Sequence, residues 1–290
     1  MEGGGCEIEM HQRVKWWNSY QRGAAIRRLM SESGKYTKHD LMEYYLHRTY
    51  KGEDCELFES LLTLAGIDRV IDLQRDMLKA AYRSLPNDRI MFNFQERFVS
   101  TPDYLTVKQS KSLLKHFCKH NSIDYANLVR DLRTVLLNQG GKRNCFYMEG
   151  DPNSGKTLLF QAPLKELYDF WAQPMQINTS STFVFCDVPM SRIIFIDEAA
   201  CDPIHLETLK LLMAGEPCLV NVKHLNATYV HRTPVIITTN NPPWFYKISE
   251  QAAFEARMFA YRCKHWPYLS NKTILNKRFN PLLYCQLLRD

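Results

Sequence analysis

The chain has no long hydrophobic run, no closely spaced cysteines and no block of lysine and arginine. A membrane-spanning helix needs about 20 apolar residues, so the sequence predicts no membrane partner. The first residues, Met1-Glu2-Gly3-Gly4-Gly5, lack the apolar core of a secretory signal, and we expect no leader there. Nine cysteines without a Cys-x-x-Cys pair argue against a disulfide framework and favour a reducing intracellular compartment.

Side chains with metal-binding spacing are also scarce. His116 and His120 lie four residues apart on an expected helix, where a surface helix face explains them better than a metal site. Across its 290 residues the chain has 45% hydrophobic residues and a net charge of +6. The hydrophobic fraction suffices for a sizeable core, and the positive net charge suits a polyanionic partner.

One stretch has the spacing of a phosphate-binding loop, G-x-x-x-x-G-K-T: Gly150-Asp151-Pro152-Asn153-Ser154-Gly155-Lys156-Thr157. An apolar strand is expected just before it and a helix over residues 157–170 just after it, which is the arrangement that this loop requires. Backbone N–H groups and the helix N-terminus would then face a polyphosphate. Lys156 can reach the β- and γ-phosphates, and the Thr157 hydroxyl can bind Mg²⁺. The sequence therefore predicts a nucleoside triphosphate and Mg²⁺ as cofactors.

Two further apolar strands end in polar side chains. Residues 192–196 lead to Asp197 and Glu198, which predicts one carboxylate that holds Mg²⁺ and a second that polarises the attacking water. A pair of acidic residues that merely follows a strand is the alternative. Residues 234–239 lead to Asn240, which either senses the γ-phosphate or simply turns the chain.

Two further segments each allow two interpretations when only their own residues are considered. Residues 219–230 predict a β-hairpin whose tip carries Lys223 and His224, which either grip a phosphate backbone or are only solvated. Arg257 lies among apolar residues after an expected helix. It either reaches the γ-phosphate of a neighbouring subunit, as an arginine finger does, or pairs with a local carboxylate.

Helices are expected through the first half of the chain. Apolar residues at helical spacing predict a series of helices between about residues 12 and 85. Thr106 with Gln109 predicts a capping box at the start of another helix. A further helix is expected to begin near Asp124 and to end at Gly140, which suits a C-terminal cap.

The order of these motifs resembles the superfamily 3 helicases of small DNA viruses, most closely the large nonstructural replication proteins of parvoviruses. The resemblance covers about residues 122–265, half of the chain, and is specific because five motifs follow one another in a compact span. It runs through Lys142-Arg143-Asn144, the phosphate-binding loop, Phe183-Val184-Phe185, residues 192–198, Leu212 to Gly215, Val222-Lys223-His224, residues 234–240 and Ala256-Arg257-Met258-Phe259.

The resemblance implies an α/β fold, a P-loop core of the AAA+ type, with an N-terminal helical region. It implies an ATP-dependent DNA helicase that moves 3′-to-5′ on single-stranded DNA during replication of a small viral genome in the host nucleus. It also implies self-assembly into a ring, typically a hexamer. The residues that it assigns to catalysis are Lys156, Asp197, Glu198, Asn240 and Arg257. Lys223 and His224 would form the hairpin that tracks DNA.

Two positions depart from the parvoviral pattern. Tryptophans usually precede two glutamates where this chain has Phe195-Ile196-Asp197-Glu198. Because the acidic pair is kept, we expect the chemistry to be kept too. The basic residue often found three positions after the finger is Ala260 here, with Arg262 close by, so no basic residue matches the second phosphate contact at this position.

The nicking nuclease that usually precedes such a core needs two histidines flanking one hydrophobic residue. No His-x-His occurs in the chain, so we expect no nicking nuclease domain. One alternative to a helicase is a captured viral remnant that binds related replication proteins and interferes with them, which the intact motifs disfavour. Another is a P-loop kinase or GTPase, and the chain lacks the guanine-reading N-K-x-D of a GTPase.

The expected parts of the chain are therefore three. Residues 1–104 form a helical region for oligomerisation, with an irregular link over 86–104. Residues 105–270 form the ATPase and helicase core. Residues 271–290 form a C-terminal tail.

Overall fold

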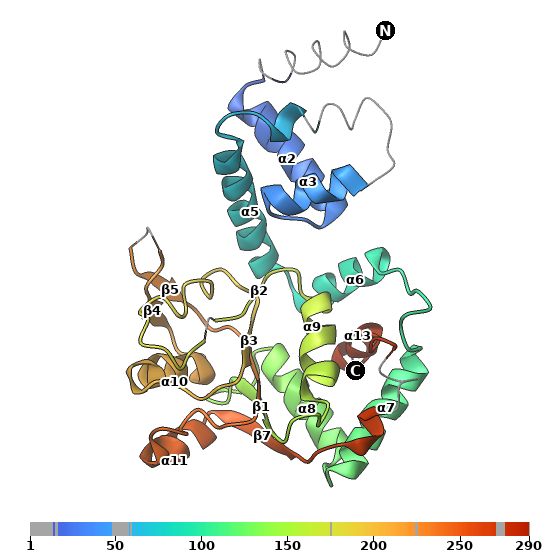
Figure 1. Ribbon diagram of the computed structural model, residues 1–290, viewed down its shortest axis with the longest axis vertical. Helices are drawn as coiled ribbons and strands as arrows, with labels where there is room; N and C mark the ends of the chain where they lie inside the picture. Colours follow the sequence, from blue (N-terminus) through green and yellow to red (C-terminus); the bar gives the residue numbers. More distant parts are fainter. Residues whose placement is uncertain are drawn as a thin grey trace. The chain divides into compact units, whose positions relative to one another are not determined.

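The computed structural model describes residues 14, 17–47, 58, 60–174, 176–223, 226–270 and 276–289, with backbone only at 45–47 and 270. The chain divides into two compact units, Met1–Tyr82 and Arg83–Asp290 (Figure 1). Among the helices in the described ranges, none combines the length and the apolar character that a membrane crossing requires.

The first unit is helical. α2 (Ser19–Ser33) starts with a capping box between Asn18 and Gln21. α3 (Lys38–His47) follows Thr37, whose hydroxyl accepts the N–H of Asp40 at 3.1 Å. α5 (Ile67–Ser84) continues to the boundary with the second unit.

A single cluster of apolar side chains forms the core of the first unit. Its buried members are Val14, Ile26, Leu29, Met30, Leu41, Phe58, Leu61, Leu62, Leu64, Ile67 and Ile71. They recur at helical spacing, so the predicted series of helices is confirmed over the described residues. The expected role of this region in oligomerisation stays a prediction.

The second unit is built on a parallel sheet in the strand order β2-β3-β6-β1-β7. The strands are β1 (Cys145–Gly150), β2 (Trp171–Ala172), β3 (Ile193–Asp197), β6 (Val235–Thr239) and β7 (Met258–Cys263). β1 lies between β6 and β7, with Cys145 opposite both Val235 and Met258. Strands covered on both faces read as continuous apolar runs, as the first residues of β1, β3 and β6 do, whereas the edge strand β7 alternates between buried and more exposed residues.

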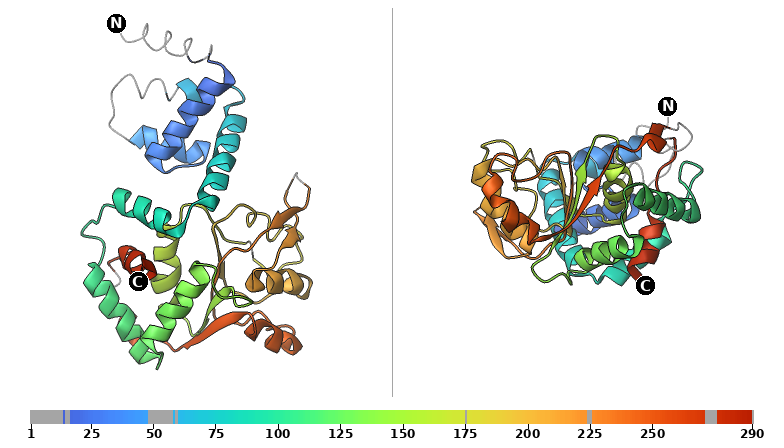
Figure 2. Two further views of the ribbon diagram at one scale, coloured as in Figure 1. Left: turned by 180° about the vertical axis from the view of Figure 1, so that it is seen from behind. Right: turned by 90° about the horizontal axis from the view of Figure 1, so that it is seen from below.

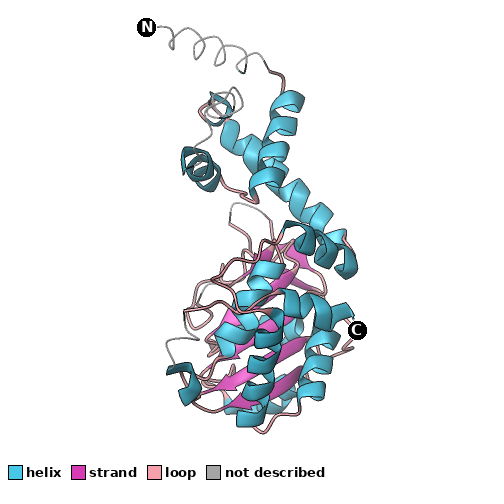
Figure 3. Cartoon of the chain, turned by 90° about the vertical axis from the view of Figure 1, so that its right-hand side faces the viewer, coloured by secondary structure: helices cyan, strands magenta, loops and turns pink. Residues whose placement is uncertain are grey.

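Helices lie on both sides of this sheet (Figures 1 and 2). One side carries α7 (Val107–His120), α8 (Tyr125–Leu136), α9 (Ala162–Leu167) and α13 (Leu282–Arg289). Figure 3 shows helices of this side in front of the strands. The other side carries α10 (Leu206–Ala214), α11 (Gln251–Glu255) and a hairpin of β4 (Cys218–Val220) and β5 (Thr228–Val230). The unit is thus a three-layer α/β fold.

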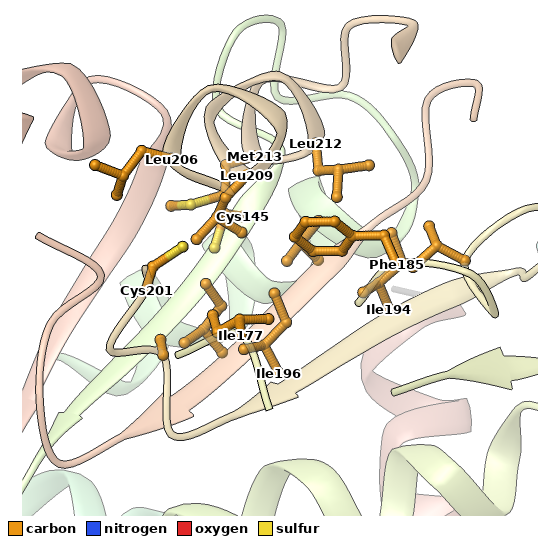
Figure 4. Packing of buried hydrophobic residues seen from close by; sticks show 14 of the residues in the cluster. Cys145, Ile177, Phe185, Ile194, Ile196, Cys201, Leu206, Leu209, Leu212 and Met213 are labelled. Atoms are coloured by element: carbon orange, nitrogen blue, oxygen red, sulfur yellow. The ribbon is translucent and has the colours of Figure 1, made fainter. Parts of the chain in front are cut away.

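The layer of α10 is held to the sheet by apolar contacts. Leu206, Leu209, Leu212 and Met213 of α10 lie over Ile194 and Ile196 of β3 and over Cys145 of β1 (Figure 4). All seven side chains are buried. This packing fixes the sheet whose strand ends carry the polar residues described below.

Two expectations for the sequence outside the core were wrong. Residues 86–104 are not an irregular link, because α6 (Asn87–Arg97) lies there and buries Ile90, Met91 and Phe94. The C-terminal residues 276–289 are not a free tail, because α13 packs against α6, α7 and α8. The Tyr284 hydroxyl of α13 donates to the Leu159 carbonyl at 2.5 Å, so this helix supports the element that follows the phosphate-binding loop.

Helix boundaries were predicted with mixed success. The capping box of Thr106 and Gln109 is present, and Asp124 caps α8. However, α8 ends at Leu136 rather than at Gly140, since Asn138 already takes a left-handed φ of 58°. The helix after the loop is also shorter than expected: a π-helical turn, η1 (Thr157–Gln161), leads into α9, which ends at Leu167.

Candidate nucleotide-binding site

The loop after β1 has the backbone that phosphate binding requires. Gly150 has a φ of 154°, and a Cβ on it would lie 1.7 Å from the carbonyl oxygen of Cys263. Gly155 has a φ of 90°, and a Cβ there would lie 3.1 Å from the ring of Trp266. Only glycine satisfies both the backbone angles and the close neighbours. The pattern of the loop is therefore dictated by its packing as well as by its ligand chemistry.

Lys156 is drawn into this loop and is only 7% exposed. Its Nζ donates to the carbonyl oxygens of Gly150 at 2.8 Å and Asp151 at 2.9 Å, and to the Ser154 hydroxyl at 3.0 Å. Burial lowers the pKa of Lys156 from its ordinary value, although nearby acidic groups, Cys263 and Glu198 foremost, act in the opposite direction. The ammonium group is thus held at the loop by oxygen atoms and is poorly solvated, which suits it to a phosphate ligand.

Asn240 connects this lysine to the carboxylates of the neighbouring strand. Lys156 Nζ donates to Asn240 Oδ1 at 3.2 Å. Asn240 Nδ2 in turn donates to Glu198 Oε1 at 2.6 Å. Glu198 follows β3 in a left-handed conformation with a φ of 56°, which turns its side chain toward the end of β6. Three predicted site residues from three separate segments therefore form one hydrogen-bonded chain.

Asp197 ends β3 and is fixed by two further residues. The Thr238 hydroxyl of β6 donates to Asp197 Oδ1 at 2.9 Å. The Gln161 amide in turn donates to Thr238 Oγ1 at 2.6 Å and to the carbonyl oxygen of Ile196 at 3.3 Å. Gln161 is 1% exposed and was not predicted, because a glutamine within a helix has no distinctive sequence pattern. Its burial among polar groups is visible only in the fold.

These residues surround a single cleft of about 330 Å³. Its walls are Pro152, Asn153, Ser154, Gly155, Lys156, Thr157, Leu158, Asp197, Glu198, Asn240 and Leu269. The structure thus brings the loop, the acidic pair and Asn240 together, as the parallel strand order requires. Leu269 was not predicted and comes from the segment after β7.

The segment after β7 also forms hydrogen bonds with the phosphate-binding loop. The N–H of Trp266 donates to the carbonyl oxygen of Asn153 at 3.2 Å, and the N–H of His265 donates to Asp151 Oδ2 at 3.0 Å. His120 contacts the carbonyl oxygen of His265 at 2.9 Å. The His120 ring stacks on the Trp266 ring, and the His116 ring lies tilted against it, so both histidines contact the residue that bonds to Asn153 of the loop.

The cleft has the oxygen atoms that a hard divalent cation prefers. Thr157 offers a hydroxyl and Asp197 a carboxylate within the same walls, a donor set that fits Mg²⁺ shared with phosphate oxygens. Elsewhere in the described parts of the chain, no three His, Cys, Asp or Glu side chains gather into a metal centre. The seven cysteines at described positions are all free thiols.

Arg257 lies away from this cleft. It immediately precedes β7, where Met258 is opposite Cys145 at the start of β1, whereas Gly150 at the loop is opposite Cys263. The length of the strand, roughly 17 Å at about 3.3 Å per residue, therefore separates Arg257 from the loop of its own chain. It donates to the carbonyl oxygen of Ala253 but forms no ion pair with any described carboxylate. Its Nε is buried without a hydrogen-bond partner among the described residues.

The predicted hairpin is present as β4 and β5, with Val220 opposite Thr228. Lys223 is exposed in its turn, and His224 lies outside the described residues. Neither Arg257 nor the described hairpin residues line the cleft.

Comparison with known proteins agrees with this geometry. The family model described as parvovirus non-structural protein NS1 matches residues 89–263. The initiator protein NS1 of Diatraea saccharalis densovirus is 28% identical over 213 residues, which is 69% of this chain and 38% of that protein. The initiator protein NS1 of Human bocavirus 2 is 29% identical over 143 residues, or 48% of this chain and 17% of that protein. The chain thus spans well under half the length of these relatives.

Solved structures agree on the fold. A JCV helicase structure superimposes with a TM-score of 0.61 and 12% identity, covering 92% of this chain and 85% of that one. A likeness at this identity concerns the fold alone. The superposition and the family match agree that the parallel sheet and its phosphate-binding loop form a fold already seen in solved proteins. The chain therefore belongs to the parvovirus non-structural protein NS1 family, and it shares a P-loop α/β fold with the JCV helicase structure.

Proposed function

We propose that this chain is the ATP-driven DNA helicase part of a viral replication initiator. The observation that supports this most strongly is the hydrogen-bonded chain Lys156–Asn240–Glu198 beside Asp197 in one cleft. It joins a phosphate-binding lysine, a polar sensor and a carboxylate, which are the groups that phosphoryl transfer to water requires. A binding module without catalysis has no need of the carboxylate–amide pair.

Each group has a defined part in hydrolysis. Lys156 exchanges its bonds to the loop carbonyls for the β- and γ-phosphate oxygens. Thr157 and Asp197 hold Mg²⁺, which when bound neutralises charge on the phosphates. Glu198 accepts a proton from the attacking water, whose oxygen bonds to the γ-phosphorus as the bond to the ADP oxygen breaks. Asn240 orients the Glu198 carboxylate and reports the presence of the γ-phosphate.

Arg257 would complete the site of a neighbouring copy. Its place at the far end of β7 excludes it from its own cleft, and its hydrogen bond goes to the carbonyl oxygen of Ala253 rather than to a described carboxylate. A cation supplied across an interface stabilises the charge of the transition state. The proposed assembly is accordingly a ring, a hexamer in the pattern of the family, with the helical residues 1–104 contributing to its closure.

The hairpin of β4 and β5 would carry the DNA contact. Lys223 and His224 at its turn would hold the backbone of single-stranded DNA and move with the nucleotide state of the ring. Travel from 3′ to 5′ and work in the host nucleus follow the pattern of the family. These parts of the proposal rest on the resemblance, with the exposure of Lys223 as local support.

The test is ATP hydrolysis by the purified chain with and without single-stranded DNA, beside Lys156→Ala. We expect hydrolysis that DNA stimulates and that the variant loses by at least about 100-fold. Strand displacement on duplexes with a 3′ or a 5′ tail then gives the direction of travel. If the folded wild-type chain shows no hydrolysis above the variant at any concentration, the motor is refuted and a non-catalytic, interfering role is favoured.

A further inference from the structure

The β4–β5 hairpin has one face on the core and one face outward. Cys218 and Val220 are buried, and Val222 packs against the same core cluster. The residues that alternate with them, Leu219, Asn221 and Lys223, are exposed. Alternation of this kind is the ordinary consequence of strand geometry.

The outward face is unusual in its composition. Leu219 is 51% exposed and Tyr229, directly opposite it across the ladder, is 60% exposed. The solvent face of an antiparallel ribbon is normally polar. Two large apolar side chains paired on that face indicate a surface that a partner covers.

The side chains of the same face limit the class of molecule that could cover it. It combines an aromatic ring and an aliphatic side chain with the Asn221 amide and the Lys223 ammonium group. The segment 217–231 contains no Asp or Glu, so nothing within it repels a polyanion. A second copy of this chain packed on the face would have to remove the Lys223 ammonium group from water, which is unfavourable without a paired carboxylate.

We propose that this face is a stacking platform for the bases of single-stranded nucleic acid, with Tyr229 as the residue on which a base stacks. Leu219 supports the Tyr229 ring from across the ladder, Asn221 reaches a base edge, and Lys223 meets a phosphate. Aromatic stacking combined with a basic group is the usual design of sites that bind single strands without sequence preference. The inference rests on the proposed DNA-binding function and adds the base, rather than the backbone alone, to what the hairpin holds.

The test compares two probes and three variants of the full chain. The probes are a fluorescent oligothymidylate and an abasic oligomer of the same length, titrated in the presence of a non-hydrolysable ATP analogue. The variants are Tyr229→Ala, Tyr229→Phe, which keeps the ring, and Tyr246→Ala. Tyr246 is 57% exposed but lies on another loop, so it is a matched control for the loss of an exposed tyrosine.

We expect the wild type to bind the oligothymidylate about tenfold more tightly than the abasic oligomer, because one stacked base is worth roughly that factor. Tyr229→Ala should lose this preference while keeping its affinity for the abasic probe and its thermal stability. Tyr229→Phe and Tyr246→Ala should behave as the wild type.

Four results would overturn the inference. An unchanged preference for bases in Tyr229→Ala would exclude Tyr229 as the platform. Equal binding of both probes by the wild type would leave a backbone contact alone, and the proposed helicase would stand. Loss of self-association in Tyr229→Ala, measured by sedimentation, would assign the face to a second copy. Binding of neither probe would refute the inference together with the DNA-binding function.

Discussion

The Asn240 side-chain amide donates to the Glu198 carboxylate, with 2.6 Å between Nδ2 and Oε1. The same side chain accepts from Lys156 through its Oδ1. One amide therefore joins the lysine of the loop to the acidic residue after β3. Because the amide contacts both groups, a phosphate that drew Lys156 away would also alter the surroundings of Glu198.

Asn240→Ala should impair turnover far more than nucleotide binding. The Glu198 carboxylate loses its orienting donor, and we expect kcat for ATP hydrolysis to fall about 100-fold with little change in KM, as loss of a positioned base does. Steady-state kinetics check this. Asn241→Ala is the matched control, because the adjacent amide side chain lies outside the cleft. An equal loss in both variants would contradict the role of the Glu198 contact.

Gln161 and Thr238 should behave as a coupled pair in stability. Gln161→Met leaves the Thr238 hydroxyl without its buried donor, and we expect a loss of about 1–3 kcal/mol in the free energy of unfolding. Adding Thr238→Val removes the second polar group as well, so the double variant should recover part of the loss. Urea unfolding of the wild type, the two single variants and the double variant measures the coupling free energy between Gln161 and Thr238. Strictly additive losses in the free energy of unfolding would show that their hydrogen bond contributes nothing.

The same pair should also govern Mg²⁺ dependence. Thr238 holds Asp197, so Gln161→Met should raise the Mg²⁺ concentration needed for half-maximal hydrolysis while the chain remains folded. A titration of ATP hydrolysis with Mg²⁺ tests this. An unaltered Mg²⁺ requirement would mean that Asp197 keeps its position without the Gln161–Thr238 contact.

Arg257 should act on the site of another copy. Lys156→Ala and Arg257→Ala are each expected to be inactive, the second by about 1,000-fold or more. A mixture of the two should regain activity, because a loop from one variant can meet the arginine of the other. A mixture of Lys156→Ala with the double variant Lys156→Ala/Arg257→Ala contains no intact loop and is the control. Failure of the first mixture to exceed the second would place Arg257 outside catalysis.

Lys156 should give the chain a stability that rises with pH. Burial lowers its pKa in the folded state below the ordinary 10.5, so the unfolded chain binds more protons between those two values. Within that window the free energy of unfolding of the wild type should increase with pH relative to Lys156→Met, which has no ammonium group. Urea unfolding of both nucleotide-free proteins at pH 7.5 and pH 10 checks the sign. Parallel profiles would contradict a buried, charged Lys156.

The elements of the site could be predicted because their patterns are local. The loop from Gly150 to Thr157 reads directly from spacing, and the strands before Asp197 and Asn240 read from continuous apolar runs. Their meeting in one cleft follows from parallel strand order, which places the ends of β1, β3 and β6 together. The structure confirms this arrangement, whereas the roles assigned to the individual residues stay predictions.

The residues that sequence reasoning missed depend on distant parts of the chain. Gln161 is important because Thr238 lies beside it, 77 positions later. Trp266 and Leu269 lie against the loop through contacts that no periodicity encodes. α13 was predicted as a tail, and its apolar residues are buried only because α6, α7 and α8 cover them. Packing across the chain, rather than local propensity, decides all three.

If Arg257 completes the cleft of a neighbouring copy, its separation from its own loop along β7 restricts how the copies can be arranged. A row of n copies joined front to back has n − 1 junctions, so the copy at one end lacks an arginine donor for its cleft and the copy at the other end offers one to nothing. A two-fold dimer uses the same surface twice and, unless that surface includes both ends of β7, completes neither cleft. Only a closed circle gives every copy both a donor and a recipient, so the number of working clefts equals the number of chains.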